Sequence, residues 1–98
     1  MTTRILEIIK WTDQGIRNVK ESPQRLDATK KAIEASGGKF IGYYLTMGRY
    51  DAVLISEAPS DEVVAIRALS VGSQGNVRTE TMKAFPEDEY RDIIAKLA

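Results

Sequence analysis

The chain has 98 residues, with 14 basic and 14 acidic side chains and neither histidine nor cysteine. This length suits one hydrophobic core, so we expect a single domain over residues 1–98. Without imidazoles or thiols, triads with histidine, Cys-His pairs, histidine-ligated haem and thiolate or imidazole zinc sites are excluded, and we expect no metal and no cofactor.

The balanced charge offers no basic footprint for nucleic acid, and no apolar run approaches the roughly 20 residues that cross a bilayer. We therefore expect neither nucleic acid nor a membrane as partner. The N-terminal residues lack the basic and apolar regions of a signal peptide, and cysteine is absent, which favours a cytoplasmic location.

The first half of the chain predicts a strand, a helix and a hairpin. Residues 4–11 carry apolar side chains on both alternating faces, as in a strand buried on two sides. Ser22-Pro23 begins a helix over residues 23–36, with Ser22 as its cap, and Gly37-Gly38 ends it. Gly48-Arg49 suits a two-residue type II′ turn, so we expect strands over residues 39–47 and 50–57.

Alternation along this hairpin predicts which residues share a face. Tyr44 pairs with Val53, and Phe40 lies on the face opposite to Tyr43. Both faces are largely apolar, whereas an antiparallel sheet normally shows one polar face to water. We therefore expect helices on one side and a partner on the other.

The second half predicts a helix over residues 60–72, capped by Ser60, a strand over residues 77–85 and a last helix over residues 87–97. The last helix is amphipathic and must dock on the body or on a neighbouring subunit. The order β-α-β-β-α-β plus a helix predicts an α+β, ferredoxin-like fold with a four-stranded antiparallel sheet. Two open sheet faces packed together would form a dimeric α+β barrel.

Several separated motifs resemble the GYD domain family. They are KWTDQGIRNVK at 10–20, SPQR at 22–25, GGK at 37–39, YLTMG at 44–48, YD at 50–51 and GNVRTETM at 75–82. The resemblance covers about residues 4–86 and implies a small prokaryotic protein of the dimeric α+β barrel type, with no established reaction, cofactor or catalytic residue. Residues 48–51 and 76–81 are also similar to the effector-binding domain of leucine-responsive transcription regulators, whose DNA-binding helices have no counterpart here.

Polar and aromatic residues at the end of the first strand form the candidate ligand site. The group comprises Lys10, Trp11, Asp13 and Arg17, and Tyr43 and Tyr44 would form its walls. The structural alternatives are that these aromatic residues belong to the core and that Asp13 forms an Asx turn.

Three further candidates lie elsewhere in the sequence. Tyr50 and Asp51 at the hairpin tip could act in a site, or Asp51 could bond to Thr46 across the hairpin. Arg78 either faces water or binds a carboxylate. The cations Lys20, Arg25, Lys30 and Lys31 are expected to form a solvated face.

We expect a cofactor-free homo-oligomer, a dimer or larger, that binds a small organic molecule near Trp11, Asp13 and Tyr50. Two alternatives stay open. One is an isomerase- or oxygenase-like enzyme, by analogy with other dimeric α+β barrels. The other is a structural or interaction module, in which the aromatic residues are core and the last helix and open sheet face serve assembly.

Overall fold

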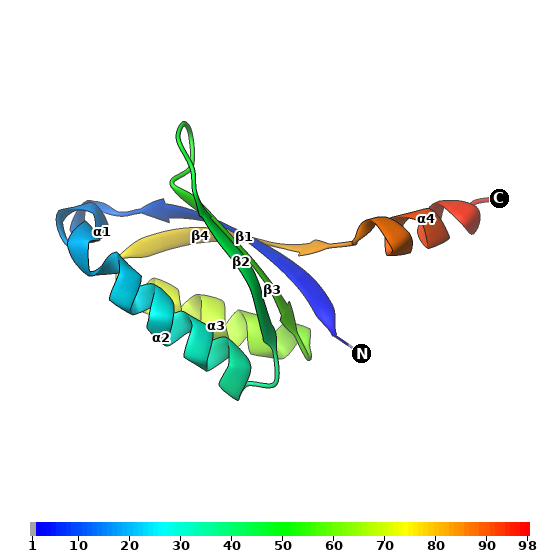
Figure 1. Ribbon diagram of the computed structural model, residues 1–98, viewed down its shortest axis with the longest axis horizontal. Helices are drawn as coiled ribbons and strands as arrows, with labels where there is room; N and C mark the ends of the chain where they lie inside the picture. Colours follow the sequence, from blue (N-terminus) through cyan, green and yellow to red (C-terminus); the bar gives the residue numbers. More distant parts are fainter. Residues whose placement is uncertain (1) are drawn as a thin grey trace.

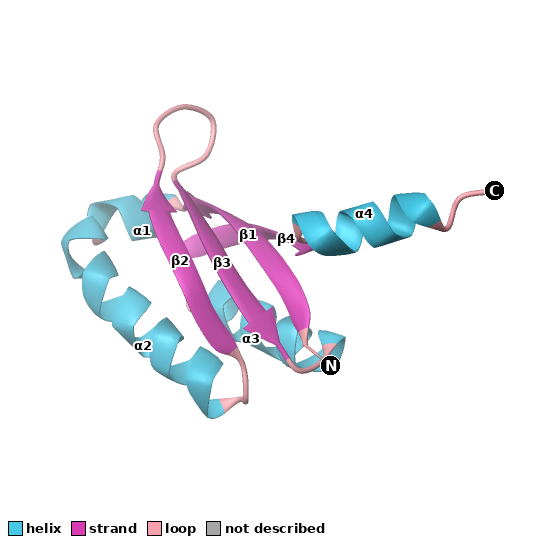
Figure 2. Ribbon diagram, turned by 45° about the vertical axis from the view of Figure 1, so that its right-hand side comes forward, coloured by secondary structure: helices cyan, strands magenta, loops and turns pink. Residues whose placement is uncertain are grey.

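A four-stranded antiparallel sheet organises the chain in the computed structural model, which describes residues 2–98 (Figure 1). The strand order is β2-β3-β1-β4, and α2 and α3 lie on one face of the sheet (Figure 2). This is the α+β, ferredoxin-like arrangement that the sequence predicts. The elements are β1 (Thr3–Trp11), α1 (Asp13–Arg17), the 3-10 turn η1 (Val19–Glu21), α2 (Ser22–Ala35), β2 (Lys39–Leu45), β3 (Ala52–Ala58), α3 (Asp61–Ser73), β4 (Val77–Ala84) and α4 (Glu87–Ala95).

The ends of the helices follow most of the local signals. Ser60 caps α3 as expected, since its Oγ accepts a hydrogen bond from the Val63 N–H over 3.3 Å. Gly37 ends α2 with a φ of +88°, a conformation that favours glycine. The predicted cap at Ser22 is wrong, because the chain enters α2 through η1 and Ser22 is already helical.

The hairpin has the predicted register but a wider loop. Tyr44 pairs with Val53, as expected, but the strands end at Leu45 and resume at Ala52. The Thr46 hydroxyl donates to the Tyr50 carbonyl over 2.8 Å, and the Thr46 N–H donates to the Asp51 carbonyl over 2.9 Å. The tight turn at Gly48-Arg49 is therefore replaced by a loop over residues 46–51.

A bulge in β2 changes the predicted faces. The pairing with β3 shifts between Phe40 and Gly42, so Ile41 is an extra residue. The extra residue resets the alternation, and Phe40 and Tyr43 both pack against the core cluster of Ile9, Ile33, Ala52 and Leu54. The prediction that Phe40 and Tyr43 lie on opposite faces was therefore wrong.

The sheet face away from α2 and α3 has no cover among the described residues. Leu6 pairs with Ile55 on one side and Met82 on the other, and Ile8 pairs with Val53. These paired side chains share one face and form a continuous apolar surface, which we call the open face. Tyr44 extends the open face along β2 and is 61% exposed.

Helix α4 projects away from the rest of the structure (Figures 1 and 2). Its stripe of Tyr90, Ile93, Ile94 and Leu97 is exposed. The sequence predicts that this helix docks either on the body of its own chain or on a neighbouring subunit. In the structure, α4 does not dock on the body of its own chain. Within residues 2–98, no helix combines the length and the apolar character needed to cross a bilayer.

Candidate functional site: a cavity between the sheet and two helices

A cavity of about 470 Å³ lies between the sheet and helices α2 and α3. Its volume is within the roughly 300–1,000 Å³ of small-molecule sites. Strand residues Glu7, Ile9 and Leu54 line it from the sheet, and both helices contribute aliphatic and polar side chains. One face of α2 borders this space, since Leu26, Thr29 and Ala32 all line the cavity.

A buried ion pair lies at the side of the cavity formed by the sheet. Arg67 of α3 and Glu7 of β1 are 8% and 5% exposed, and Ser56 of β3 is fully buried. Arg67 Nη2 donates to Glu7 Oε1, and also to Ser56 Oγ over 3.1 Å. Burying an ion costs several kcal/mol unless the ion is paired and hydrogen-bonded. The charges of Arg67 and Glu7 therefore compensate each other in the folded chain.

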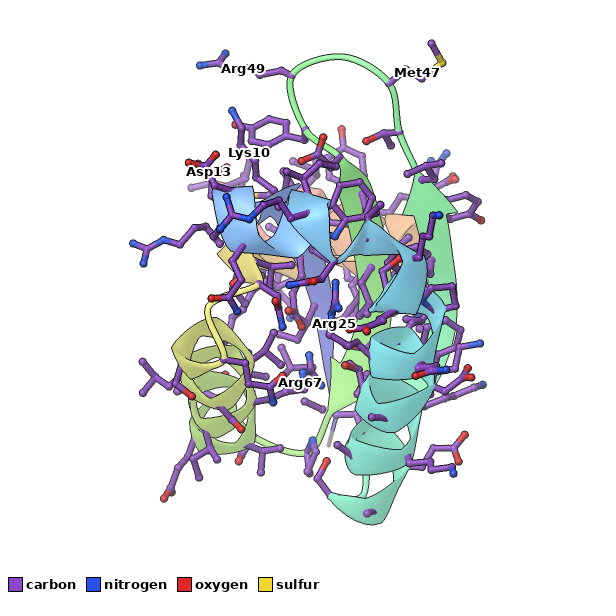
Figure 3. The ribbon with its side chains drawn as sticks, turned by 90° about the vertical axis from the view of Figure 1, so that its left-hand side faces the viewer. Lys10, Asp13, Arg25, Met47, Arg49 and Arg67 are labelled. Atoms are coloured by element: carbon purple, nitrogen blue, oxygen red, sulfur yellow. The ribbon has the colours of Figure 1, made fainter. Side chains whose placement is uncertain are left out.

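Two guanidinium groups at the cavity have unused donors. Arg67 Nη1 and Arg25 Nη2 are buried and have no hydrogen-bond partner within residues 2–98. The other arm of Arg25 donates to the Asn18 carbonyl over 3.3 Å. Figure 3 shows Arg25 and Arg67 in the space between α2 and α3. Both guanidinium groups therefore have hydrogen-bonding capacity that no other described residue takes up.

Two aromatic residues complete the lining near α1. Burial raises the pKa of the Tyr43 phenol above its ordinary value of 10.0; the charge of Arg25 opposes this shift, and that of Asp51 adds to it. Tyr43 therefore supplies a neutral hydroxyl at neutral pH. Trp11 is the single tryptophan of the chain and also lines the cavity, so its fluorescence reports on this site.

Hydrogen bonds from Thr12 to the loop that leads into β4 hold the start of helix α1 beside the cavity. The Thr12 N–H donates to the Asn76 carbonyl over 3.1 Å, and the Thr12 hydroxyl donates to the Gly75 carbonyl. The same hydroxyl caps α1 by accepting from the Gly15 N–H over 3.0 Å. Thr12 thus caps α1, and Asp13, for which an Asx turn was the structural alternative, is the exposed first residue of this helix.

The structure separates the residues that the sequence singled out. Trp11 and Tyr43 line the cavity, whereas the remaining candidates are outside its lining. Lys10 and Arg78 are register partners on β1 and β4, and both are exposed. The others are Asp13 and Arg17 on α1, Tyr44 on the open face, and Tyr50 and Asp51 in the loop over residues 46–51. Ligand binding by these residues stays a prediction.

The Asp51 side chain has a structural partner other than the expected one. Its Oδ2 accepts from the Trp11 backbone N–H over 2.9 Å, rather than from Thr46. The Asp51 N–H also donates to the Ile9 carbonyl over 2.9 Å. These two bonds attach the loop over residues 46–51 to the end of β1, next to a wall of the cavity.

The charged residues of the cavity were missed at first, although the sequence carries a signal for each. Glu7 lies between Ile5 and Ile9 at the period of a strand, and so shares their buried face. Arg67 follows Val63 and Val64 at helical spacing, on their stripe. Arg25 precedes Thr29 by one helical turn and lines the cavity, so its placement on a solvated face was wrong.

Compared with protein families, with characterised proteins and with solved structures, the sequence matches one family. The family described as "GYD domain" matches residues 6–94. A protein of Thermus thermophilus named "Glutamine synthetase and cystathionine beta-lyase binding protein" is 32% identical over 87 residues, which cover 88% of each chain. No solved structure matches the chain significantly. The chain therefore belongs to the GYD domain family.

Proposed function

We propose that this GYD domain binds a small organic molecule in the cavity between the sheet and α2 and α3, and that it does so as a homodimer. The cavity itself carries the proposal. It joins aliphatic and aromatic walls with a few fixed polar groups, the composition that small-molecule sites commonly have. Arg67 is hydrogen-bonded to Glu7 and Ser56, so the Glu7 and Arg67 side chains that line the cavity are oriented before a ligand arrives.

Two exposed apolar surfaces support assembly with a second copy. The open face has Leu6, Ile8, Val53 and Ile55 at its centre, each half-buried within its own chain. Contiguous apolar surfaces of this kind mark contacts between proteins. A two-fold dimer would place the open face against itself, and α4, which projects away from its own sheet (Figure 1), would pack on the second copy.

A second candidate function is the binding of other proteins. The name of the Thermus thermophilus relative refers to binding of glutamine synthetase and cystathionine beta-lyase. The exposed stripe of α4 suits the helix-in-groove mode of recognition. Purified samples of these two enzymes, titrated with this chain and with an Ile93→Glu variant, would test this candidate by light scattering. A complex that depends on Ile93 would favour protein binding, and the absence of any complex would contradict it.

The small-molecule proposal is tested with a library of neutral, anionic and cationic fragments. Binding is followed by two-dimensional ¹H–¹⁵N spectra of the full chain, with the Trp11 indole N–H as the main reporter. We expect bound fragments to shift the signals of cavity residues from β1, α2 and α3 together. Shifts confined to the open face, or no shifts with any fragment, would contradict the proposal.

Two alanine positions on α2 provide a matched pair of variants. Ala32 and Ala35 are both exposed, but only Ala32 lines the cavity. Ala32→Phe introduces a ring at the cavity, and we expect it to weaken fragment binding by about tenfold or more, because the ring takes up space that a fragment would fill. Ala35→Phe should leave binding unchanged.

A further inference from the structure

We infer that the ligand of this cavity is a monoanion: a carboxylate attached to an apolar body, held between Arg25 and Arg67. This inference rests on the proposed small-molecule function and adds the chemical class of the ligand. Its basis is the combination of charge, unused donors and apolar walls in one cavity.

The first argument is the charge of the lining. Arg25, Arg67 and Glu7 are the three charged side chains that line the cavity. Glu7 is ion-paired with Arg67 and balances one of the two positive charges. One positive charge is left over, and a partly buried charge is stabilised by an opposite charge close by. A single negative charge on the ligand would complete the balance.

The second argument is the type of hydrogen-bonding group that the cavity lacks. The unpartnered atoms, Arg67 Nη1 and Arg25 Nη2, are both donors, so the missing groups are acceptors. In each arginine one arm is already engaged, by Glu7 and Ser56 or by the Asn18 carbonyl. A carboxylate has two acceptor oxygens, which suits one free arm from each helix.

The third argument is the apolar character of the remaining walls. Leu26 of α2, Leu54 of β3 and Val71 of α3 line the same space. Trp11 adds a large aromatic surface, and the raised pKa of Tyr43 keeps its phenol neutral. Small inorganic anions would leave these walls without contacts. A branched aliphatic or aromatic body on the carboxylate would fill the space and gain from apolar burial.

The test compares acids with their uncharged amides. Phenylacetate, 3-phenylpropionate and 4-methylpentanoate are each paired with the corresponding amide, and inorganic phosphate is a further probe. Affinities for the full chain are measured by calorimetry and by the shift of the Trp11 indole signal. We expect at least one acid to bind about tenfold or more tightly than its amide, as for a charge-assisted hydrogen bond.

Three variants, one of them a control, test whether the two cavity arginines cause this preference for acid over amide. Arg25→Gln removes the unbalanced charge and should reduce the preference for acid over amide to within about threefold. Arg49→Gln is the matched control, because Arg49 is an exposed cation outside the cavity, and it should keep the preference. Arg67→Lys keeps a partner for Glu7 but loses the second arm, and should weaken acid binding in a chain that still folds.

The outcomes separate this inference from the proposed function. If acids and amides bind equally and Arg25→Gln changes neither, the cavity binds small molecules but the assignment of a monoanion is overturned. Phosphate binding tighter than every organic acid would overturn the carboxylate with an apolar body. If no acid or amide binds while other fragments shift the cavity signals, only this inference fails. If no compound binds at all, the proposed function fails with it.

Discussion

Replacing Arg67 with methionine would leave the Glu7 carboxylate buried at the sheet without its ion-pair partner. Breaking a buried pair from one side costs about 3–5 kcal/mol. A domain of 98 residues has a total stability of about 5–15 kcal/mol, at roughly 0.05–0.15 kcal/mol per residue. Arg67→Met should therefore remove at least about a fifth of the stability and lower the melting temperature by about 12 °C or more.

Urea unfolding followed by Trp11 fluorescence and by circular dichroism would measure this loss. The matched control is Arg4→Met, because Arg4 also pairs with a glutamate, Glu57, over 3.0 Å and across the same sheet. The Arg4 pair is partly exposed, with 31% and 27% of the two side chains accessible, so we expect a cost below about 1 kcal/mol.

A second variant tests the cause of the loss. Glu7→Leu combined with Arg67→Met removes both charges, and should be more stable than Arg67→Met alone by about 2 kcal/mol or more. If Arg67→Met lowers the free energy of unfolding no more than Arg4→Met does, or if the double variant is no more stable than Arg67→Met alone, Arg67 does not stabilise the buried Glu7 carboxylate in the folded chain. Either result would refute the reasoning about the buried pair.

Three other predictions concern titration, close packing and assembly. The stability contributed by the protonated phenol of Tyr43 is complete below its unfolded pKa of 10.0 and is lost as the pH rises through the raised folded pKa. Tyr43→Phe should therefore flatten the decline in urea stability between about pH 9 and 11. Gly15→Ala would place a Cβ against the Asn76 carbonyl and should destabilise the chain by about 1–3 kcal/mol in the same assay, whereas Gly72→Ala meets no atom within 4 Å and should be tolerated; equal costs would contradict the packing argument. Ile93→Glu puts a charge on the stripe of α4 and should shift the chain from dimer to monomer in sedimentation velocity, and an unchanged sedimentation coefficient would argue against α4 as a dimer contact.

Local sequence patterns predict the order of the elements well. The strands of residues 4–11 and 77–85 and the long helices appear within a few residues of their expected bounds. These elements have strong signals: alternating apolar residues, a Ser60 cap and a glycine at position 37. The same signals predict the ferredoxin-like fold class, because the order of elements leaves few ways to bury one face of the sheet.

Local sequence patterns predicted less reliably those features that depend on contacts with residues distant in the sequence. The loop over residues 46–51 is wider than expected, and within it Asp51 accepts a hydrogen bond from the backbone N–H of Trp11 in β1, 40 residues away in the sequence. The bulge at Ile41 has no local signal in the sequence, and it changes the face of Phe40. In both cases, pairing with another strand determined the outcome.

The sequence by itself determined the fold class, the absence of histidine and cysteine chemistry, and an apolar surplus on both sides of the sheet. Only the tertiary structure decided which polar residues meet. Glu7, Arg25 and Arg67 come from three different elements, and the local pattern around each one indicates the face on which it lies but not that the three side chains meet. They converge because β1, α2 and α3 pack around one cavity, where burial turns separate charges into a paired and partly unsatisfied site.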